Sequence, residues 1–318
     1  LDDGLIWLYC DSTGVHGHRG LATYDSTDNG SLQVSPQPGG TLLWIATGGT
    51  NNLDNSRAVT VDSAGYVYTA GTLSSGTAEF DSISFPTYAY GDPFVAKYNP
   101  AGIPEWVLLL GSANSEQGYY IAVDGDGNGY LAGLFQDTSQ FGSFSLTSSG
   151  ESDGFLAKID PDGTVLWVKQ IGGTGSDAVK SVAVDSDSNI VITGTFSGTA
   201  SFDTDSKTSS GNTDIFVAKL DASGTYAWIN TAGGGYADNV EDIAVDAGNN
   251  IFITGSFKDT ADFGAIPLTA QGSTNGYVSK LNSAGGFVWT FPLLTPGNAF
   301  GKGITTSAAG DVYVTGNF

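Results

Sequence analysis

The amino-acid sequence predicts an all-β fold, a five-bladed β-propeller whose ring is closed by strands from both termini. Three observations carry this prediction: a fixed repeat step, four strand-like runs in each repeat, and half-repeats at the two ends of the chain. The repeat is considered first, because overlooking an internal repeat would misassign the whole fold.

One tryptophan in each repeat sets the step. Successive members are 62, 61, 61 and 61 residues apart, and a Val-Asp pair and a strand-ending glycine keep the same step. A feature present in every repeat is most simply structural, so we interpret the tryptophans as packing anchors between sheets, with sugar stacking as the alternative. The five anchors are Trp44, Trp106, Trp167, Trp228 and Trp289.

Each repeat contains four strand candidates, shown by the runs 179–186, 189–196, 214–221 and 225–232. The runs alternate in polarity or are rich in β-branched and aromatic residues, and Asp, Gly, Ser and Asn turns separate them. A long polar loop after the second run carries a phenylalanine that we expect to pin the loop onto its own blade. Four short antiparallel strands per repeat are typical of a propeller blade.

A lysine also recurs at the repeat step in the third run. We predict that it forms an ion pair within its own blade with the aspartate of the Val-Asp pair. A ring of cationic ligands is the alternative. The lysines are Lys97, Lys158, Lys219 and Lys280.

The chain ends determine the predicted number of blades. Residues 304–318 supply the first and second strands of a blade, and residues 31–35 and 41–49 supply the third and fourth. Joined, the two halves make a fifth blade beside four whole ones, and residues 5–10 become a surplus strand. We therefore divide the chain into a degenerate N-terminal segment, residues 1–31, and a single propeller domain, residues 32–318.

The repeat resembles a known family. The matching features are VAVD at 182–185, the Asp- and Asn-rich turn after it, the Thr-Gly that ends the next strand, and DIFVAKL at 214–220 with its following tryptophan. In this combination the chain resembles, over about residues 32–318, the bacterial β-propeller repeat family SBBP. The resemblance implies a propeller and an extracellular or cell-envelope location. It implies no catalytic residues and no settled ligand.

Composition excludes several partners. The net charge is −22, from 33 acidic against 11 basic residues, and such a surface repels nucleic acid and anionic lipid. No stretch approaches 18 apolar residues, so we expect no membrane insertion. The single cysteine excludes an internal disulfide. The chain begins at Leu1 and contains no Met, which favours a mature or excised product whose leader, if any, is gone.

One turn fits the opening of a calcium loop. The sequence DGDGNG at 124–129 alternates short oxygen donors with glycine, as calcium loops do. The downstream glutamate of an EF-hand is missing, and the equivalent turns of other repeats lose donors. Two interpretations stay open: calcium held by Asp124, Asp126 and Asn128, or a plain hairpin turn. We expect no other cofactor.

The N-terminal residues form the candidate interface. GVHGHRG at 14–20 holds both histidines of the chain, and their i, i+2 spacing on a strand would suit a divalent metal. No third ligand is near, so an exposed loop or interface is the other interpretation. The surplus strand could also add to the exposed sheet edge of a neighbouring subunit and build a polymer. The residues in this set are Trp7, Cys10, His16, His18 and Arg19.

Phosphate-binding loops and the H-E-x-x-H motif, which mark common enzyme classes, are missing from the sequence. We therefore expect a non-enzymatic extracellular module for surface assembly, adhesion or display, associating with itself or with a cell-surface partner. One alternative is a carbohydrate-binding propeller, which predicts matching exposed aromatics in each groove between blades. Another is a glycan-cleaving enzyme, which predicts one asymmetric carboxylate pair at a channel mouth.

Overall fold

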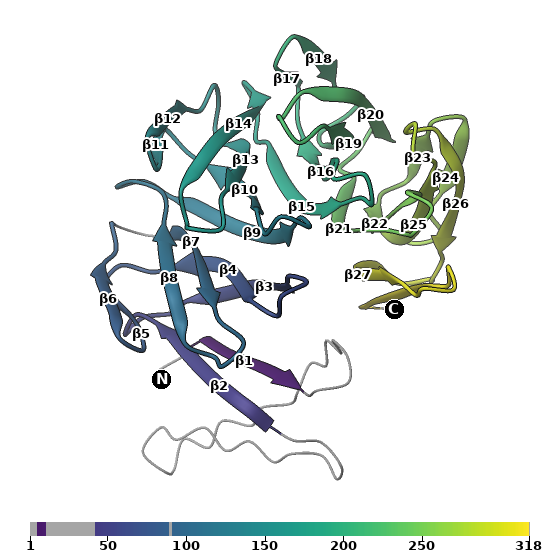
Figure 1. Ribbon diagram of the computed structural model, residues 1–318. Coiled ribbons are helices and arrows are strands. Elements are labelled where there is room, and N and C mark those ends of the chain that lie inside the picture. The colour runs from purple at the N-terminus through teal and green to yellow at the C-terminus, as the bar shows by residue number, and fades with distance from the viewer. Residues whose placement is uncertain (1–4, 11–41, 89–90, 318) are drawn as a thin grey trace.

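The computed structural model describes residues 5–10, 42–88 and 91–317. Every helix or strand assigned within these ranges is a strand. The strands form antiparallel sheets arranged around a common centre (Figure 1). The prediction of an all-β fold is confirmed.

Four of the sheets contain complete blades, in each of which four antiparallel strands pair in their order along the chain. The first blade is β3 (Asn55–Val61), β4 (Val67–Leu73), β7 (Asp92–Tyr98) and β8 (Pro104–Leu109). The second is β9 (Glu116–Val123), β10 (Gly129–Phe135), β13 (Asp153–Ile159) and β14 (Val165–Gly173). The third is β15 (Ala178–Val184), β16 (Ile190–Phe196), β19 (Asp214–Leu220) and β20 (Tyr226–Gly234). The fourth is β21 (Asn239–Val245), β22 (Ile251–Phe257), β25 (Asn275–Leu281) and β26 (Phe287–Leu293).

The first strand of each blade lies at the middle of the ring (Figure 1). There β3 contacts β9, β9 contacts β15, and β15 contacts β21. The later strands of each blade lie progressively farther from the centre. Side chains from different blades can therefore meet where they lie on the first strands.

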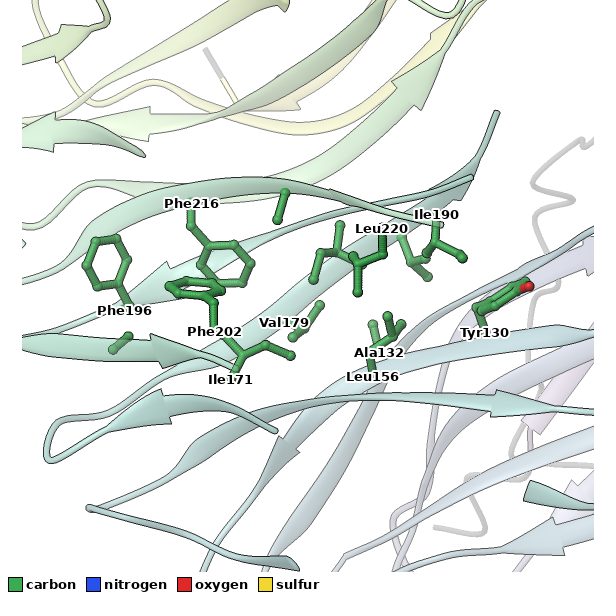
Figure 2. Close-up of a cluster of buried hydrophobic side chains, with 14 residues drawn as sticks. Tyr130, Ala132, Leu156, Ile171, Val179, Ile190, Phe196, Phe202, Phe216 and Leu220 are labelled. Atoms are coloured by element: carbon green, nitrogen blue, oxygen red, sulfur yellow. The ribbon is translucent and has the colours of Figure 1, made fainter. Parts of the chain in front are cut away.

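A short hairpin is inserted between the second and third strands of each blade. In three of the four hairpins the backbone pairs with the fourth strand of the preceding sheet, as in the pair Gly172 with Ser201. The hairpin at 138–147 forms a two-stranded sheet of its own. The phenylalanine of a hairpin packs on its own blade, with the rings of Phe202 and Phe216 5.1 Å apart (Figure 2). The expected role of this phenylalanine is confirmed, and the three hairpins that pair with a preceding sheet each strap two sheets together. The hairpins are β5 (Thr77–Phe80) with β6 (Ile83–Pro86), β11 (Thr138–Phe141) with β12 (Phe144–Thr147), β17 (Thr199–Phe202) with β18 (Asp205–Thr208), and β23 (Thr260–Phe263) with β24 (Ile266–Thr269).

The hydrophobic core lies between blades. In one cluster, Tyr130 and Leu156 of the second blade pack with Val179, Ile192 and Phe216 of the third (Figure 2). A single blade would expose such a face to water, so each blade depends on its neighbours for stability.

The two ends of the chain form separate half-blades. β27 (Phe300–Thr306) and β28 (Val312–Asn317) make a two-stranded sheet, and β1 (Leu5–Cys10) pairs with β2 (Leu42–Gly49). β1 thus takes the place beside the fourth strand that a third strand holds in a complete blade. Residues 31–35, predicted for that place, lie outside the described residues. Within the described part of the chain, β28 pairs with β27 alone, so the two half-blades are not joined in one sheet.

Candidate functional site

Each first strand is interrupted by a β-bulge at the same repeat position. The pairing register shifts between Ser56 and Ala58 on β3, and the equivalent shift occurs on β9, β15, β21 and β27. A bulge leaves one residue unpaired and re-aims its side chain, and bulges are common next to active sites. The five unpaired residues, called here the bulge ring, are Arg57, Tyr119, Lys180, Glu241 and Lys302.

The side chains of the bulge ring meet across the blades. The Arg57 guanidinium lies 4.9 Å from the centre of the Tyr119 ring, and Lys180 Nζ lies 4.5 Å from the same centre. On the other side, Lys302 Nζ is 2.7 Å from Glu241 Oε1. One residue from each of five strands therefore contributes to a single polar cluster at the ring centre.

The bulge ring is positively charged and partly dehydrated. Burial lowers the pKa of Lys180, the Glu241 carboxylate opposes this, and the Arg57 and Lys302 charges lower it further. Burial also raises the pKa of Tyr119. The cluster holds three cations and one carboxylate in a protein that has only 11 Lys and Arg against 33 acidic residues. It is a local positive centre within an acidic protein.

A buried aspartate supports the strands beside the bulge ring. Asp242 Oδ1 accepts hydrogen bonds from Ser181 Oγ at 3.0 Å and from its neighbour's backbone N–H, and Oδ2 accepts one from the Ile304 N–H at 2.9 Å. These contacts tie β15, β21 and β27 to one another. Burial raises the pKa of Asp242.

Sequence reasoning did not identify the bulge ring. This position holds a different residue in almost every repeat, but the positions directly before and after it vary as well, so it does not stand out. The residues are 61 or 62 apart, and nothing in the local pattern marks the bulges that turn them inward.

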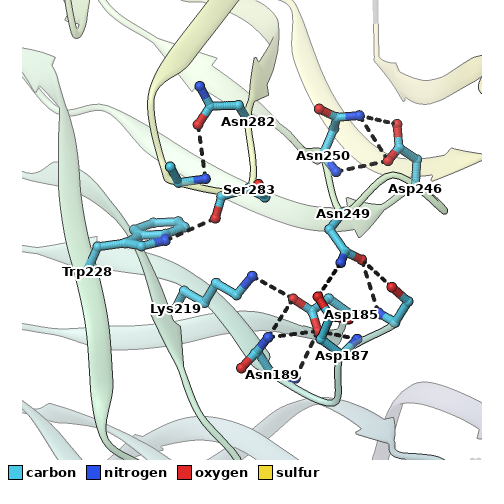
Figure 3. Close-up of polar contacts among 12 residues, drawn as sticks. Asp185, Asp187, Asn189, Lys219, Trp228, Asp246, Asn249, Asn250, Asn282 and Ser283 are labelled. Atoms are coloured by element: carbon cyan, nitrogen blue, oxygen red, sulfur yellow. Dashed lines mark hydrogen bonds and ion pairs between the residues drawn. The ribbon is translucent and has the colours of Figure 1, made fainter.

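The predicted tryptophan anchors lie between blades. Trp106 Nε1 donates to the Pro161 carbonyl of the next blade at 3.0 Å, and Trp228 Nε1 donates to the Ser283 carbonyl at 3.3 Å (Figure 3). A Cβ on the turn glycine Gly163 would lie only 3.0 Å from the Trp106 ring. The indoles pack closely on the neighbouring turn, which is the geometry of a packing anchor.

The recurring lysines make three kinds of contact: an ion pair, hydrogen bonds to backbone carbonyls, and contacts with aromatic rings. Lys280 makes the last kind, with its Nζ 5.2 Å from the centre of the Phe252 ring. Lys219 Nζ lies 2.6 Å from Asp185 Oδ2 in its own blade (Figure 3), so the predicted ion pair is confirmed in this repeat. Lys97 and Lys158 donate instead to backbone carbonyls of the next blade, those of Pro161 and Ala222, at 2.9 and 3.2 Å.

The predicted calcium residues share one tight turn. Asp124 Oδ1 accepts the N–H groups of Asp126 and Asn128 at 3.0 and 2.9 Å, and Oδ2 accepts the Tyr130 hydroxyl at 2.9 Å. Burial opposes ionisation, but the Asn128 and Tyr130 hydrogen bonds hold the pKa of Asp124 below its usual value. The hairpin interpretation accounts for these contacts, and calcium binding at this turn stays a prediction.

Most of the residues proposed for the N-terminal interface fall outside the part of the chain that the structure describes. His16, His18 and Arg19 lie outside the described residues, as do the side chains of Trp7 and Cys10 on β1. Across the described part of the chain, no group of three or more His, Cys, Asp or Glu side chains is placed to hold a metal. That part also holds no helix long and apolar enough to cross a membrane.

A surface hollow of about 330 Å³ lies between the β17–β18 turn and β20. Tyr226 and Trp228 form one wall, and Asp203 and Asp205 form the other. Among the described residues, the exposed aromatics do not recur at one repeat position; they are Tyr88, Tyr236, Phe291 and Tyr313.

These features define a repeat protein of the β-propeller class. The family described as "Beta-propeller repeat" (SBBP) matches residues 166–195, so the family resemblance is confirmed there. An uncharacterized WD repeat-containing protein of Acanthamoeba polyphaga mimivirus is 26% identical over 222 residues, 58% of this chain and 16% of that protein. The regulatory protein FlaEY of Caulobacter vibrioides is 29% identical over 140 residues, 43% of this chain and 15% of that protein. The chain therefore matches only a small part of either relative's length.

Two solved structures are similar in outline. A protein of unknown function from Bacteroides caccae has a TM-score of 0.35 at 8% identity, covering 75% of this chain and 82% of that one. A mutant apocarotenoid oxygenase from Synechocystis has a TM-score of 0.43 at 12% identity, covering 82% of this chain and 56% of that one. At these TM-scores neither likeness bears on function.

Proposed function

We propose that this chain is a non-enzymatic binding module whose ligand is an acidic group held by the bulge ring. The proposal rests on one observation: three cations gather around a single carboxylate, that of Glu241, in a protein of net charge −22. The cations are Arg57, Lys180 and Lys302. A positive site with low-dielectric walls attracts anions and strengthens each contact made to them. Carboxylated or sulfated glycans are the ligand class we favour. The proposal is therefore a form of the carbohydrate-binding alternative.

We propose a role in adhesion or display at the cell surface, where the resemblance to the repeat family leads us to expect this chain. Polymer formation through residues 1–10 has less support, because Leu5–Cys10 pairs with β2 of its own chain. Glycan cleavage also gains no support from the two carboxylates at and beside the bulge ring. Glu241 is held in an ion pair, and Asp242 is saturated by a hydroxyl and two backbone amides.

We further propose that the ring closes with five blades. β28 and β1 are the two open edges, and pairing them would complete a sheet in the order β27, β28, β1, β2 with the strand positions of a complete blade. Hydrogen exchange along β28 checks this. Protection of its outer-edge amides to the level of β22 supports closure, and exchange at the rate of an exposed edge contradicts it.

Calorimetric titration with heparin oligosaccharides and with polygalacturonate oligomers tests the binding proposal. We expect one site per chain, binding that weakens as salt rises, and recovery of the oligomers intact. Lys180→Ala should weaken binding by about tenfold or more, since a hydrogen bond to a charged group contributes about 1.5–3 kcal/mol. The matched control is Lys258→Ala, which removes an exposed cation that lies over the Tyr236 ring and belongs to neither candidate site. Equal losses in the two variants, or no binding of either probe, would contradict the proposal.

The hollow beside Trp228 is a second candidate glycan site, favoured by its aromatic wall and facing carboxylates. An array that carries both neutral and acidic glycans distinguishes the two sites. Binding that survives Lys180→Ala and disappears in Asp205→Ala would assign the ligand to this hollow. The reverse pattern assigns it to the bulge ring.

A further inference from the structure

Two acidic side chains lie at each junction between complete blades. One opens the third strand of a blade, and the other opens or directly precedes the first strand of the next blade. All six side chains are at most 3% exposed. The junction pairs are Asp92 with Glu116, Asp153 with Asp177, and Asp214 with Asp238.

Each junction holds a buried carboxylate oxygen that no protein group satisfies. Asp153 Oδ2 accepts from Gln170 Nε2 at 2.6 Å and from the Ser149 N–H at 3.1 Å, whereas Asp153 Oδ1 has no partner. Asp214 Oδ1 is in the same situation at the next junction, and Glu116 Oε2 at the preceding one. A buried unsatisfied acceptor costs free energy, so its recurrence at three junctions needs an explanation.

A glycine leaves open the space that these oxygens face. A Cβ on Gly233 would lie 2.7 Å from Asp214 Oδ1 and 3.0 Å from Asp238 Oδ2. A Cβ on Gly111 would lie 3.0 Å from Glu116 Oε2 and 3.2 Å from Asp92 Oδ1. Oxygens from two blades therefore flank one small space at each of these junctions. At the middle junction a Cβ on Gly172 would lie 2.8 Å from Asp153 Oδ1.

The junction between the fourth blade and β27 is an internal control. At the equivalent positions it has Asn275, Leu294 and Ala299 in place of the acid, the glycine and the second acid. Asn275 is satisfied there, because its Oδ1 accepts from the Gln271 N–H at 2.7 Å and its Nδ2 donates to the Thr295 carbonyl at 3.1 Å. The fourth junction thus shows that two blades can pack together without carboxylates between them. At this fourth junction both carboxylates and the glycine are replaced together.

Buried carboxylate pairs need a compensating positive charge. Burial raises the pKa of Asp177 to about 6, and the Asp153 charge adds to the rise; Asp238 is raised to about 6 in the same way beside Asp214. None of the ion pairs found among the described residues involves these four aspartates. Either a proton or a bound cation must offset the repulsion within each pair.

We propose that the three junctions are calcium sites, each holding one Ca²⁺ between adjacent blades with carboxylate oxygens from both. Ca²⁺ takes oxygen ligands in flexible geometry. Two carboxylates can therefore supply part of its coordination shell, and backbone carbonyls and water can supply the rest. Mg²⁺ fits less well, because it demands a rigid octahedron. The cation binds the folded ring and links blades, so it stabilises the folded state by mass action.

Calorimetry and thermal unfolding of the calcium-stripped chain test the proposal. We expect three calcium equivalents and a rise in Tm of roughly 10 °C at calcium one hundred times its Kd. The variant Asp92→Asn/Asp153→Asn/Asp214→Asn installs the residue that the fourth junction carries, and it should lose both responses. The matched control Asp81→Asn/Asp137→Asn/Asp259→Asn removes three exposed charges at positive-φ positions that Asn tolerates, and it should keep both.

Three results would overturn the proposal. The first is a wild type without a calcium response, and the second is an Asn variant that keeps it. The third is a wild type stabilised by acid and not by calcium, which would show that each pair shares a proton. If the triple variant fails to fold, the single change Asp214→Asn should lower the stoichiometry by one. None of these results depends on the bulge ring.

Discussion

Two sets of buried aspartates recur at the same step and behave in opposite ways. Asp185 lies in a hairpin turn, and Asp177 lies at a blade junction. Burial raises the pKa of Asp185, but the Lys219 ammonium and the Asn189 amides bring it below its usual value. Burial raises the pKa of Asp177 to about 6, because two backbone N–H groups, from Gly173 and Ser197, do not offset it.

The contrast shows that hydrogen-bond donors, and not burial alone, decide whether a carboxylate stays ionised. The turn aspartate is saturated, so its charge holds the turn and the lysine in place (Figure 3). At the junctions, the backbone N–H groups that bind the aspartates are too few to offset the negative charge of both carboxylates. The contacts within the turn account for the turn aspartates. They do not account for the paired charges of the junction aspartates, and for this reason the junctions point to a ligand.

The largest expected effect separates the two sets directly. Asp185→Ala should lower the free energy of unfolding by about 3 kcal/mol, because it strands a mostly buried Lys219 and several turn amides. In calcium-free buffer Asp214→Asn should change the free energy of unfolding by less than about 1 kcal/mol, because the fourth junction tolerates Asn at this position. Urea denaturation at neutral pH measures both. A cost at Asp214 as large as that at Asp185 would remove the distinction.

A smaller effect is expected from closing the space at a junction. Gly172→Ala should cost about 2 kcal/mol and abolish the calcium response at that junction, since its Cβ would lie 2.8 Å from Asp153 Oδ1. Gly297→Ala is the control, because a Cβ there meets nothing within 4 Å, and it should stay within about 0.5 kcal/mol of wild type. Equal costs in the two variants would show that the junction space is not special.

The smallest effect per residue concerns pH. The folded chain binds protons at Asp177 and Asp238 more tightly than the unfolded chain, with pKa values of about 6 against 3.8, so their contribution to stability is lost as pH rises through about 6. Discounted for solvent screening, each contributes about 1 kcal/mol.

With calcium chelated, Tm should therefore rise as the pH falls from about 8 to about 5. Below about pH 4 it should fall again, because the turn aspartates Asp124, Asp185 and Asp246 have lowered pKa values and lose their stabilising charge on protonation. Calcium should flatten the upper limb. A Tm independent of pH between 5 and 8 without calcium would contradict the assignment of raised pKa values to the junctions.

The sequence alone was sufficient for the features that a local pattern encodes. Strand runs, turn residues, the repeat step and the tryptophan anchors depend on neighbours within one repeat. It also predicted that the phenylalanine pins its loop onto its own blade, but not that the hairpin backbone extends the preceding blade's sheet. The surplus strand predicted at residues 5–10 pairs with β2 in the structure. Sequence spacing could not show this, because a β-strand's partner is chosen by tertiary packing and not by its own pattern.

The sequence by itself therefore determined that this chain is a repeat of four-stranded sheets, because alternating polarity and turn chemistry are local properties. Only the tertiary structure decided where the chemistry lies. The bulge ring gathers side chains 61 or 62 residues apart, and each junction pair joins residues from two blades. Such clusters depend on how blades pack around a centre, and on a one-residue bulge that turns Lys180 and its counterparts toward it.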